Sequence, residues 1–246
     1  VNQNGNSTFT PDLVAIKNRD QTDSWQIFDV GRGVTKTQFW DLSVVPVTDT
    51  EGLSTFDSDG FTVGSRNEVN TSTEKYVAFQ WLAGGAPSSN TVGTIDMNVS
   101  HNSDAKFAIG VSSEDIPASG SFTMGHPLGA TPEFIICKQF EKGSDWPVWH
   151  KDSGNLTQGY LKTDQPDALA TSSSVWDDAG PTSTLIKSNR SHWFASEKIM
   201  YYAWIGVEGF SKFGAYEGND NLDGPYVHLG FRPAVLILKN IDAGTS

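Results

Sequence analysis

Pro11-Asp12-Leu13-Val14-Ala15-Ile16-Lys17-Asn18 decides the fold of this chain, because the same pattern occurs three times. It returns as Pro132-Glu133-Phe134-Ile135-Ile136-Cys137-Lys138-Gln139 and again as Pro233-Ala234-Val235-Leu236-Ile237-Leu238-Lys239-Asn240. In each copy a proline opens a short apolar run and a lysine closes it. Apolar runs of this length, bounded by proline and polar residues, are typical of strands buried on both faces. We therefore predict a buried β-strand at each of the three places.

The repetition continues beyond this strand. Trp25-Gln26-Ile27-Phe28-Asp29 follows the first copy at the same distance as Trp146-Pro147-Val148-Trp149-His150 follows the second. Further along, the aromatic segment Tyr76–Trp81 corresponds to Ile199–Trp204. Internal repeats of this kind indicate repeated structural units.

The repeats divide the chain into three expected parts. Residues 1–90 form a first β-sandwich repeat, residues 91–209 form a second with its leading strands, and residues 210–246 form the opening strands of a third copy. Burying the four apolar side chains of the third strand, at 235–238, contributes roughly 6–10 kcal/mol. We therefore expect this segment to pack on the second repeat. The alternative is that it adds as a strand to a neighbouring subunit.

The composition favours an all-β fold. The chain has 246 residues, of which 37% are hydrophobic and 19% are charged, and it holds 24 glycines. Its apolar runs are short, and turns rich in glycine, asparagine and aspartate separate them. No stretch of useful length shows the periodicity of an amphipathic helix. We therefore predict tandem β-sandwich repeats of the jelly-roll type.

Charge and cysteine content exclude several partners and sites. The net charge is −12, and the 17 basic residues are scattered singly, so we expect no nucleic-acid partner. No apolar stretch approaches the ~18 residues that span a bilayer, so we expect no membrane insertion. The single cysteine, Cys137, lies inside a repeated apolar strand. It forms neither an internal disulfide nor a cysteine metal cluster.

The sequence carries no motif for catalysis. Its five histidines stand alone, without the spacing of metal ligands: His101, His126, His150, His192 and His228. The nucleophile motif G-x-S-x-G and a phosphate-binding loop are also missing. Among 29 acidic residues a pair at hydrolase spacing arises by chance, and the sequence singles none out. We expect no enzymatic activity.

Aromatic residues supply the candidates for a binding surface. Tryptophans that recur at equivalent places in the repeats are expected in the core, because the shared architecture requires them there. Several other aromatics have no such counterpart. From these we take four as candidates for exposed contacts with a glycan or receptor: Trp40, Trp176, Trp193 and Tyr216.

Calcium is the one cofactor for which the loop sequences offer candidate ligands. We expect no other cofactor. Asn219-Asp220-Asn221-Leu222-Asp223-Gly224 places oxygen-bearing side chains at alternate positions, as in the first half of an EF-type loop. Gly230 stands where that loop has its bidentate glutamate. The turn Asp57-Ser58-Asp59-Gly60 is shorter still. The candidate ligands are therefore Asp220, Asp223, Asp57 and Asp59. The alternative is that these residues only make ordinary turns.

Four motifs of the first repeat also carry a resemblance. They are Pro-Asp-Leu-Val-x-Ile-Lys-Asn-Arg at 11–19, Ser-Trp-Gln-Ile-Phe-Asp at 24–29, Phe-Asp-Ser-Asp-Gly-Phe at 56–61 and Tyr-Val-Ala-Phe-Gln-Trp at 76–81. In this order they resemble a repeated, functionally uncharacterised domain of virion and tail-fibre-like proteins of marine bacteriophages. The resemblance implies a lectin-like, concanavalin-like β-sandwich and no catalytic residues. The second copy departs from the pattern at Gln139 and His150.

The resemblance sets the expectations about function. We expect a structural protein located in the virion, either a tail fibre or spike or another surface adhesion module, that acts by multivalent non-covalent binding. The first alternative is a capsid decoration or filament-forming lattice protein, and the second is a carbohydrate-binding module. The expected partners are other virion proteins, further copies of the chain, and a host surface glycan or receptor.

Overall fold

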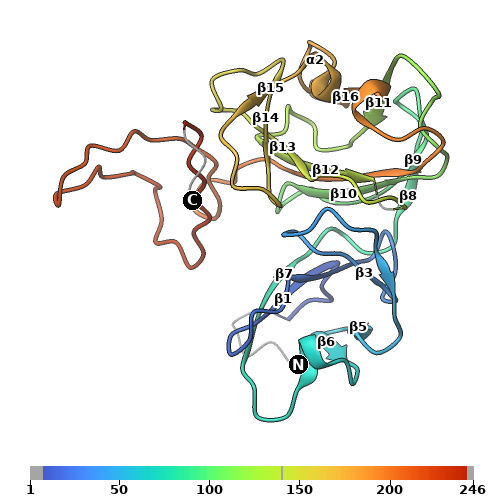
Figure 1. The fold of residues 1–246 in the computed structure, drawn as a ribbon, viewed down its shortest axis with the longest axis vertical. Helices are drawn as coiled ribbons and strands as arrows, with labels where there is room; N and C mark the ends of the chain where they lie inside the picture. The colour runs from blue at the N-terminus through green and yellow to red at the C-terminus, as the bar shows by residue number, and fades with distance from the viewer. Residues whose placement is uncertain (1–7, 140, 243–246) are drawn as a thin grey trace.

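The computed structural model describes residues 8–139 and 141–242, and its regular structure is almost entirely antiparallel β-sheet (Figure 1). The first part of the chain contains β1 (Leu13–Asn18), β2 (Gln26–Asp29), β3 (Lys36–Thr37), β4 (Val47–Thr48), β5 (Leu53–Asp57), β6 (Gly60–Val63), α1 (Asn67–Asn70) and β7 (Tyr76–Trp81). The second part contains β8 (Ser88–Asn90), β9 (Met97–Asn102), β10 (Phe107–Ser112), β11 (Ser121–Gly125), β12 (Phe134–Gln139), β13 (Pro147–His150), β14 (Gly159–Lys162), β15 (Ala170–Thr171), α2 (Ser173–Trp176), β16 (Leu185–Asn189), a 3-10 turn (Arg190–His192) and β17 (Ile199–Trp204).

Two sheets carry the architecture of the described residues. The smaller has the strand order β2-β1-β7, and the larger has the order β15-β14-β13-β12-β17-β10-β9-β8. Three further strand pairs form separate two-stranded sheets: β3-β4, β5-β6 and β11-β16. The predicted all-β class is thereby confirmed. No helix in this part of the chain is both long and apolar enough to cross a membrane.

The two sheets contain the same central three-strand unit. Leu13 of β1 lies opposite Trp81 of β7, and the corresponding Phe134 of β12 lies opposite Trp204 of β17. The hairpin strands β2 and β13 pair with the other side of β1 and β12, again in matching register. The sequence repeat is therefore a repeat of three paired strands. That each repeat is a complete jelly-roll sandwich stays a prediction, as do the limits of the three parts.

The sheets stack so that the repeated strands are buried on both faces, as predicted for the first two copies. Ala15 of β1 and Ile136 of β12 belong to a core shared by the two sheets. Their neighbours Val14 and Ile135 point to the opposite faces, because successive side chains alternate along a strand. Figure 1 shows β11, β16 and α2 outside the larger sheet and β5 and β6 outside the smaller one. The two repeats therefore share one core.

The third copy differs from the expectation. Residues 210–242, here called the arm, form no strand and extend away from both sheets (Figure 1). The four apolar side chains at 235–238 are 49%, 66%, 74% and 60% exposed. The expectation of a buried strand on the second repeat is therefore wrong. The flanking strands of the second repeat, β13 and β17, are already paired with β12, so they are not available to the third copy.

The arm touches the body of the protein at a few points. Phe213 stacks on Phe134, with ring centroids 5.3 Å apart. Near the other end, the Leu169 N–H donates to the carbonyl of Ile241 at 2.9 Å. Between these points most arm residues are exposed to solvent.

Candidate functional site

A buried polar cluster joins the two repeats. Asp29 Oδ2 accepts a hydrogen bond from Tyr202 Oη of β17 at 2.6 Å. It also accepts one at 2.6 Å from Nε of Arg32, a residue that follows β2. Other guanidinium N–H groups of Arg32 donate to the carbonyls of Lys36 at 3.0 Å and Ile27 at 3.1 Å. The side chains of Asp29 and Arg32 are 0% and 1% exposed. The cluster thus connects the smaller sheet to the larger one from inside the shared core.

The electrostatics of this cluster favour one charge state. Burial raises the pKa of the Tyr202 phenol well above its ordinary value, and the charge of Asp29 acts in the same direction. Burial alone would lower the pKa of Arg32, but the charge of Asp29 raises it overall. Tyr202 therefore stays a neutral donor and Arg32 stays a cation. Because the cluster is closed to solvent, it holds the sheets together and is not placed to bind a substrate.

In the first two copies, the lysine of the repeat motif closes the hairpin that follows it. Lys17 Nζ donates to the carbonyl of Asp23, and Lys138 Nζ donates to the corresponding carbonyl of Ser144. In the arm, Lys239 Nζ donates instead to the carbonyl of Gln165, at 3.0 Å. The motif lysine is therefore a structural residue.

Lys138 is an unusual lysine because it is 0% exposed. Its Nζ lies 5.2 Å from the ring centroid of Trp146, within range of a cation–π interaction. Burial lowers the pKa of Lys138 to about 8, and the carboxylates of Asp164 and Asp145 oppose this shift. The groups around the Lys138 ammonium therefore stabilise its charge less well than water would.

Two of the four candidate contact aromatics lie in the core. Trp176 and Trp193 are 0% and 3% exposed. Their indole N–H groups donate to the carbonyl of Gly159 at 3.0 Å and to Ser188 Oγ at 2.8 Å. The expectation that these two rings are exposed is wrong, because α2 and the turn after β16 fold them against the larger sheet. Neither can contact a ligand in this conformation.

The other two candidates differ from each other. Trp40 is half-buried against the shared core, and its ring lies 6.0 Å from that of Trp81 and 6.3 Å from that of Trp25. Tyr216 is 52% exposed and lies in the arm. The structure therefore does not bring the four candidates together in one site.

Two of the calcium candidates, Asp57 and Asp59, lie in the β5–β6 hairpin. Asp57 accepts hydrogen bonds from Thr55 Oγ1 and Thr62 Oγ1, both at 2.7 Å. These hydrogen bonds lower the pKa of Asp57. Asp59 lies in the turn itself. The Asp57 carboxylate thus braces the hairpin.

The candidates in the arm also serve local turns. Asn219 Oδ1 accepts from the Asn221 N–H, and Asn221 Oδ1 accepts from the Asp223 N–H, both at 3.1 Å. Asp220 has a left-handed backbone with φ of 49°, which aspartate tolerates in such turns. Within residues 8–139 and 141–242, no three or more His, Cys, Asp or Glu side chains are grouped to hold a metal ion. The two calcium candidate turns lie in separate parts of the fold.

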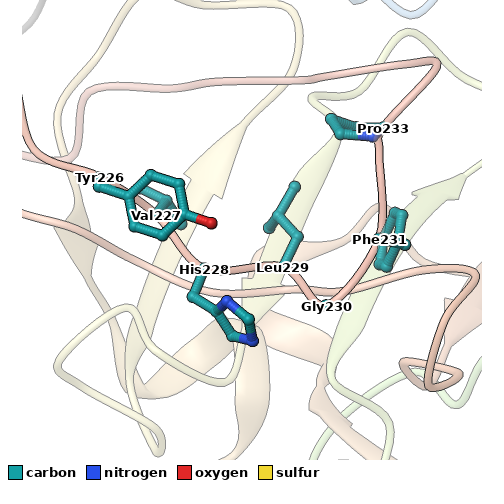
Figure 2. A pocket seen from close by; sticks show the side chains of 7 residues that line it. All are labelled: Tyr226, Val227, His228, Leu229, Gly230, Phe231 and Pro233. Atoms are coloured by element: carbon teal, nitrogen blue, oxygen red, sulfur yellow. The ribbon is translucent and has the colours of Figure 1, made fainter.

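Two hollows mark the surface. The first, of about 460 Å³, is a bend of the arm lined by Tyr226, Val227, His228, Leu229, Gly230, Phe231 and Pro233 (Figure 2). One exposed segment forms all of its lining. The second, of about 320 Å³, lies beside Glu114, whose carboxylate accepts from the Asp96 N–H at 2.9 Å. Neither hollow joins residues from the two repeats.

The two equivalent aromatic strands differ in burial, a feature that the sequence reasoning did not identify. Every residue of β17 is buried between β12 and β10. Every residue of β7 is half-buried, although β7 pairs with β1 in the same register as β17 pairs with β12. Lys106-Phe107, which leads into β10, recurs in the arm as Lys212-Phe213.

Fold and surface together define a β-rich repeat protein whose two halves share a core and whose third repeat motif is exposed. The chain belongs to the family described as "Domain of unknown function (DUF7483)", which matches residues 2–246. No curated protein and no solved structure matches the chain.

Proposed function

We propose that this protein is a structural and adhesive module of a phage particle, located in a tail fibre or spike. The observation that supports the proposal is the duplicated three-strand unit, whose two copies pack face to face through one aromatic core. Such a unit is stiff, because bending it would separate stacked rings and break the cluster at Asp29. The module acts without covalent chemistry, by presenting loops on a rigid support.

Binding through such loops gains strength from repetition. Contacts that are weak singly become strong when many copies of a module engage one surface. A host glycan or receptor is the proposed target, and other virion proteins are the proposed neighbours. The resemblance of the repeat motifs to virion proteins of marine phages supports this location.

A second candidate function is a capsid decoration or filament-forming lattice protein. The exposed arm favours it, because the apolar side chains at 235–238 are between 49% and 74% exposed. Exposed apolar segments of this kind mark sites of protein–protein contact. In this function, contacts between subunits would dominate over contacts with the host.

Immunogold electron microscopy tests both functions. Antibodies raised against the purified chain are applied to intact phage particles whose genome encodes it, and mass spectrometry of the same particles checks for its peptides. We expect labelling of the tail fibres or tail tip. Regular labelling of the capsid would favour the lattice function instead, and particles without label or peptides would contradict both.

A further inference from the structure

We propose that two copies of this chain form a closed dimer, in which residues 232–239 of each arm dock on residues 41–51 of the other copy. Residues 232–239 are here called the arm segment, and residues 41–51 are called the loop. The inference concerns these two surfaces alone and does not depend on a place in a virion.

The loop is an exposed apolar surface of the first repeat and includes β4. Four of its apolar side chains are 39–48% exposed: Leu42, Val44, Val45 and Val47. Elsewhere in the described body of the protein, the exposed large apolar side chains stand singly in the sequence: Val92, Leu156 and Phe194. Single apolar residues on a surface are ordinary, whereas a contiguous group of them marks a contact with another protein.

The arm segment is a second surface of the same kind. Its apolar side chains at 235–238 are 49–74% exposed, and none of them lies in a strand. If the two surfaces meet, the apolar side chains of both leave water together, which is the main driving force of protein association.

The two surfaces carry opposite charges. The loop contains Asp41, Asp49 and Glu51 and no basic residue, whereas the arm segment begins with Arg232, ends with Lys239 and contains no acidic residue. Each copy has a net charge of −12, so two copies repel each other unless surfaces of opposite sign meet. Charge complementarity of this kind selects the partner surface. A second copy therefore offers the arm segment a surface that fits it in both polarity and charge.

Acidic groups of the loop are available for this contact. Asp41 and Glu51 are exposed, and neither forms an ion pair within the described residues. Two cations beside the loop have partners of their own. Arg66 pairs with Asp49 at 3.0 Å, and Lys36 Nζ donates to a threonine hydroxyl of β4 at 2.6 Å.

The positions of the two surfaces favour a twofold dimer. Both border the same turn of the second repeat, since Thr163 Oγ1 donates to the carbonyl of Trp40 at 2.7 Å and Lys239 Nζ donates to the carbonyl of Gln165 at 3.0 Å. Within one copy they leave each other exposed. Because two complementary surfaces lie beside one turn, a twofold axis can place each arm segment on the loop of the other copy. Such a contact is isologous and closes with two copies.

Sedimentation velocity of the full 246-residue chain over a range of concentrations tests the proposal. We expect wild type to form dimers and nothing larger as its concentration rises. Ile237→Asp and Val45→Lys should each weaken dimerisation about tenfold or more, because each gives one surface a charge of the same sign as the surface that it meets. The matched controls are Leu222→Asp in the arm and Val92→Lys in the body, at exposed apolar residues outside both surfaces. Both controls should dimerise like wild type.

Charge reversal tests whether the arm segment meets the loop of the other copy. The arm variant combines Arg232→Glu with Lys239→Glu, and the loop variant combines Asp41→Lys with Glu51→Lys. Alone, each variant opposes like charges and should dimerise about tenfold more weakly or worse. In an equal mixture, both arm segments meet loops of opposite sign, so dimers of one arm variant and one loop variant should form.

Melting temperatures check that each variant folds; if the loop variant does not fold, Ile237→Asp and its control Leu222→Asp decide the question. A wild type that stays monomeric, an Ile237→Asp variant that dimerises like wild type, or a mixture of folded charge variants that stays monomeric would each overturn the proposal. Species larger than a dimer would contradict the closed twofold contact. A chain that dimerises as expected but labels no phage particle would retract only the proposed function.

Discussion

At the scale of single residues, the stability of this protein depends on polar groups enclosed in its shared core. Asp29, Arg32 and Tyr202 have their hydrogen bonds satisfied by one another and by backbone carbonyls. Removing one member leaves the others without access to water. Buried ion pairs contribute little compared with apolar packing, but breaking one by removing a partner is costly.

We predict that Asp29→Ala destabilises the fold by about 3–5 kcal/mol, because Arg32 would remain buried without a counter-charge. Urea denaturation followed by tryptophan fluorescence measures the change in the free energy of unfolding. Asp104→Ala, at an exposed turn residue, is the control and should leave the midpoint unchanged. A loss below about 1 kcal/mol for Asp29→Ala would show that the cluster adds no stability.

Lys138 gives a pH-dependent prediction. Its pKa is about 8 in the folded protein and 10.5 for an ordinary lysine, so between these values the unfolded chain binds more protons. The free energy of unfolding therefore rises with pH across this window. Lys138→Met removes this contribution, so relative to the variant, wild type should gain about 2 kcal/mol between pH 7 and pH 10.

Urea denaturation of both proteins at the two pH values measures this difference. Lys142→Met is the control, because the Lys142 side chain is 53% exposed. It should show the same pH dependence as wild type. Parallel pH profiles for wild type and Lys138→Met would contradict the assigned shift.

At the scale of elements, the same strand has different energetics in the two repeats. Trp204 of β17 is 8% exposed and stacks on Phe107, whereas the equivalent Trp81 of β7 is half-buried. In the second repeat β10 pairs with β17 and brings Phe107 against the Trp204 ring. Repeat-equivalent residues therefore do not make equivalent contributions.

We predict that Trp204→Ala costs about 3–5 kcal/mol, in the range of large core truncations. Trp81→Ala should cost clearly less, because part of its ring surface is already in water. Both variants are measured by chemical denaturation at the same protein concentration as wild type. Equal losses would indicate that Trp81 is as well covered as Trp204.

At the scale of the whole molecule, the chain divides into a packed body and an exposed arm. The body has three cores separated by two sheets, while the arm packs mainly through Phe213 and Ile241. Segments with few buried contacts and no strand pairing open with little cost in free energy. We therefore expect a protease to cleave the arm before the rest of the described chain.

We predict that limited trypsin digestion cleaves after Lys212 and Lys239, which are exposed in the arm, before it cleaves in the strands. Mass spectrometry of the early fragments identifies the sites. First cuts within the sheets would contradict the division into body and arm.

The local pattern of the sequence was enough to predict the repeated strands. Apolar runs closed by lysine mark β1 and β12 because burial on both faces requires near-continuous apolar residues. The same reasoning failed for 235–238, whose composition is equally apolar. Exposure there depends on which strands remain unpaired, and no residue within the segment carries that information.

The candidate site shows the same division. Of the four candidate aromatics that the sequence selected, only Tyr216 is largely exposed. Trp176 and Trp193 are buried by a short helix and a turn whose positions depend on distant strands. The cluster of Asp29 with Tyr202 also joins residues far apart in the chain, which composition and spacing do not reveal.

The sequence by itself determined the strand class, the three copies of the motif and the segments that correspond between the first two repeats, because these depend on local burial patterns and on similarity between copies. Only the tertiary structure decided that the two repeats share a core, that β17 is covered while β7 is half-buried, and that the third copy is exposed. These properties depend on which surfaces meet in space. Burial is a property of a pair of surfaces, and a single segment specifies only one of them.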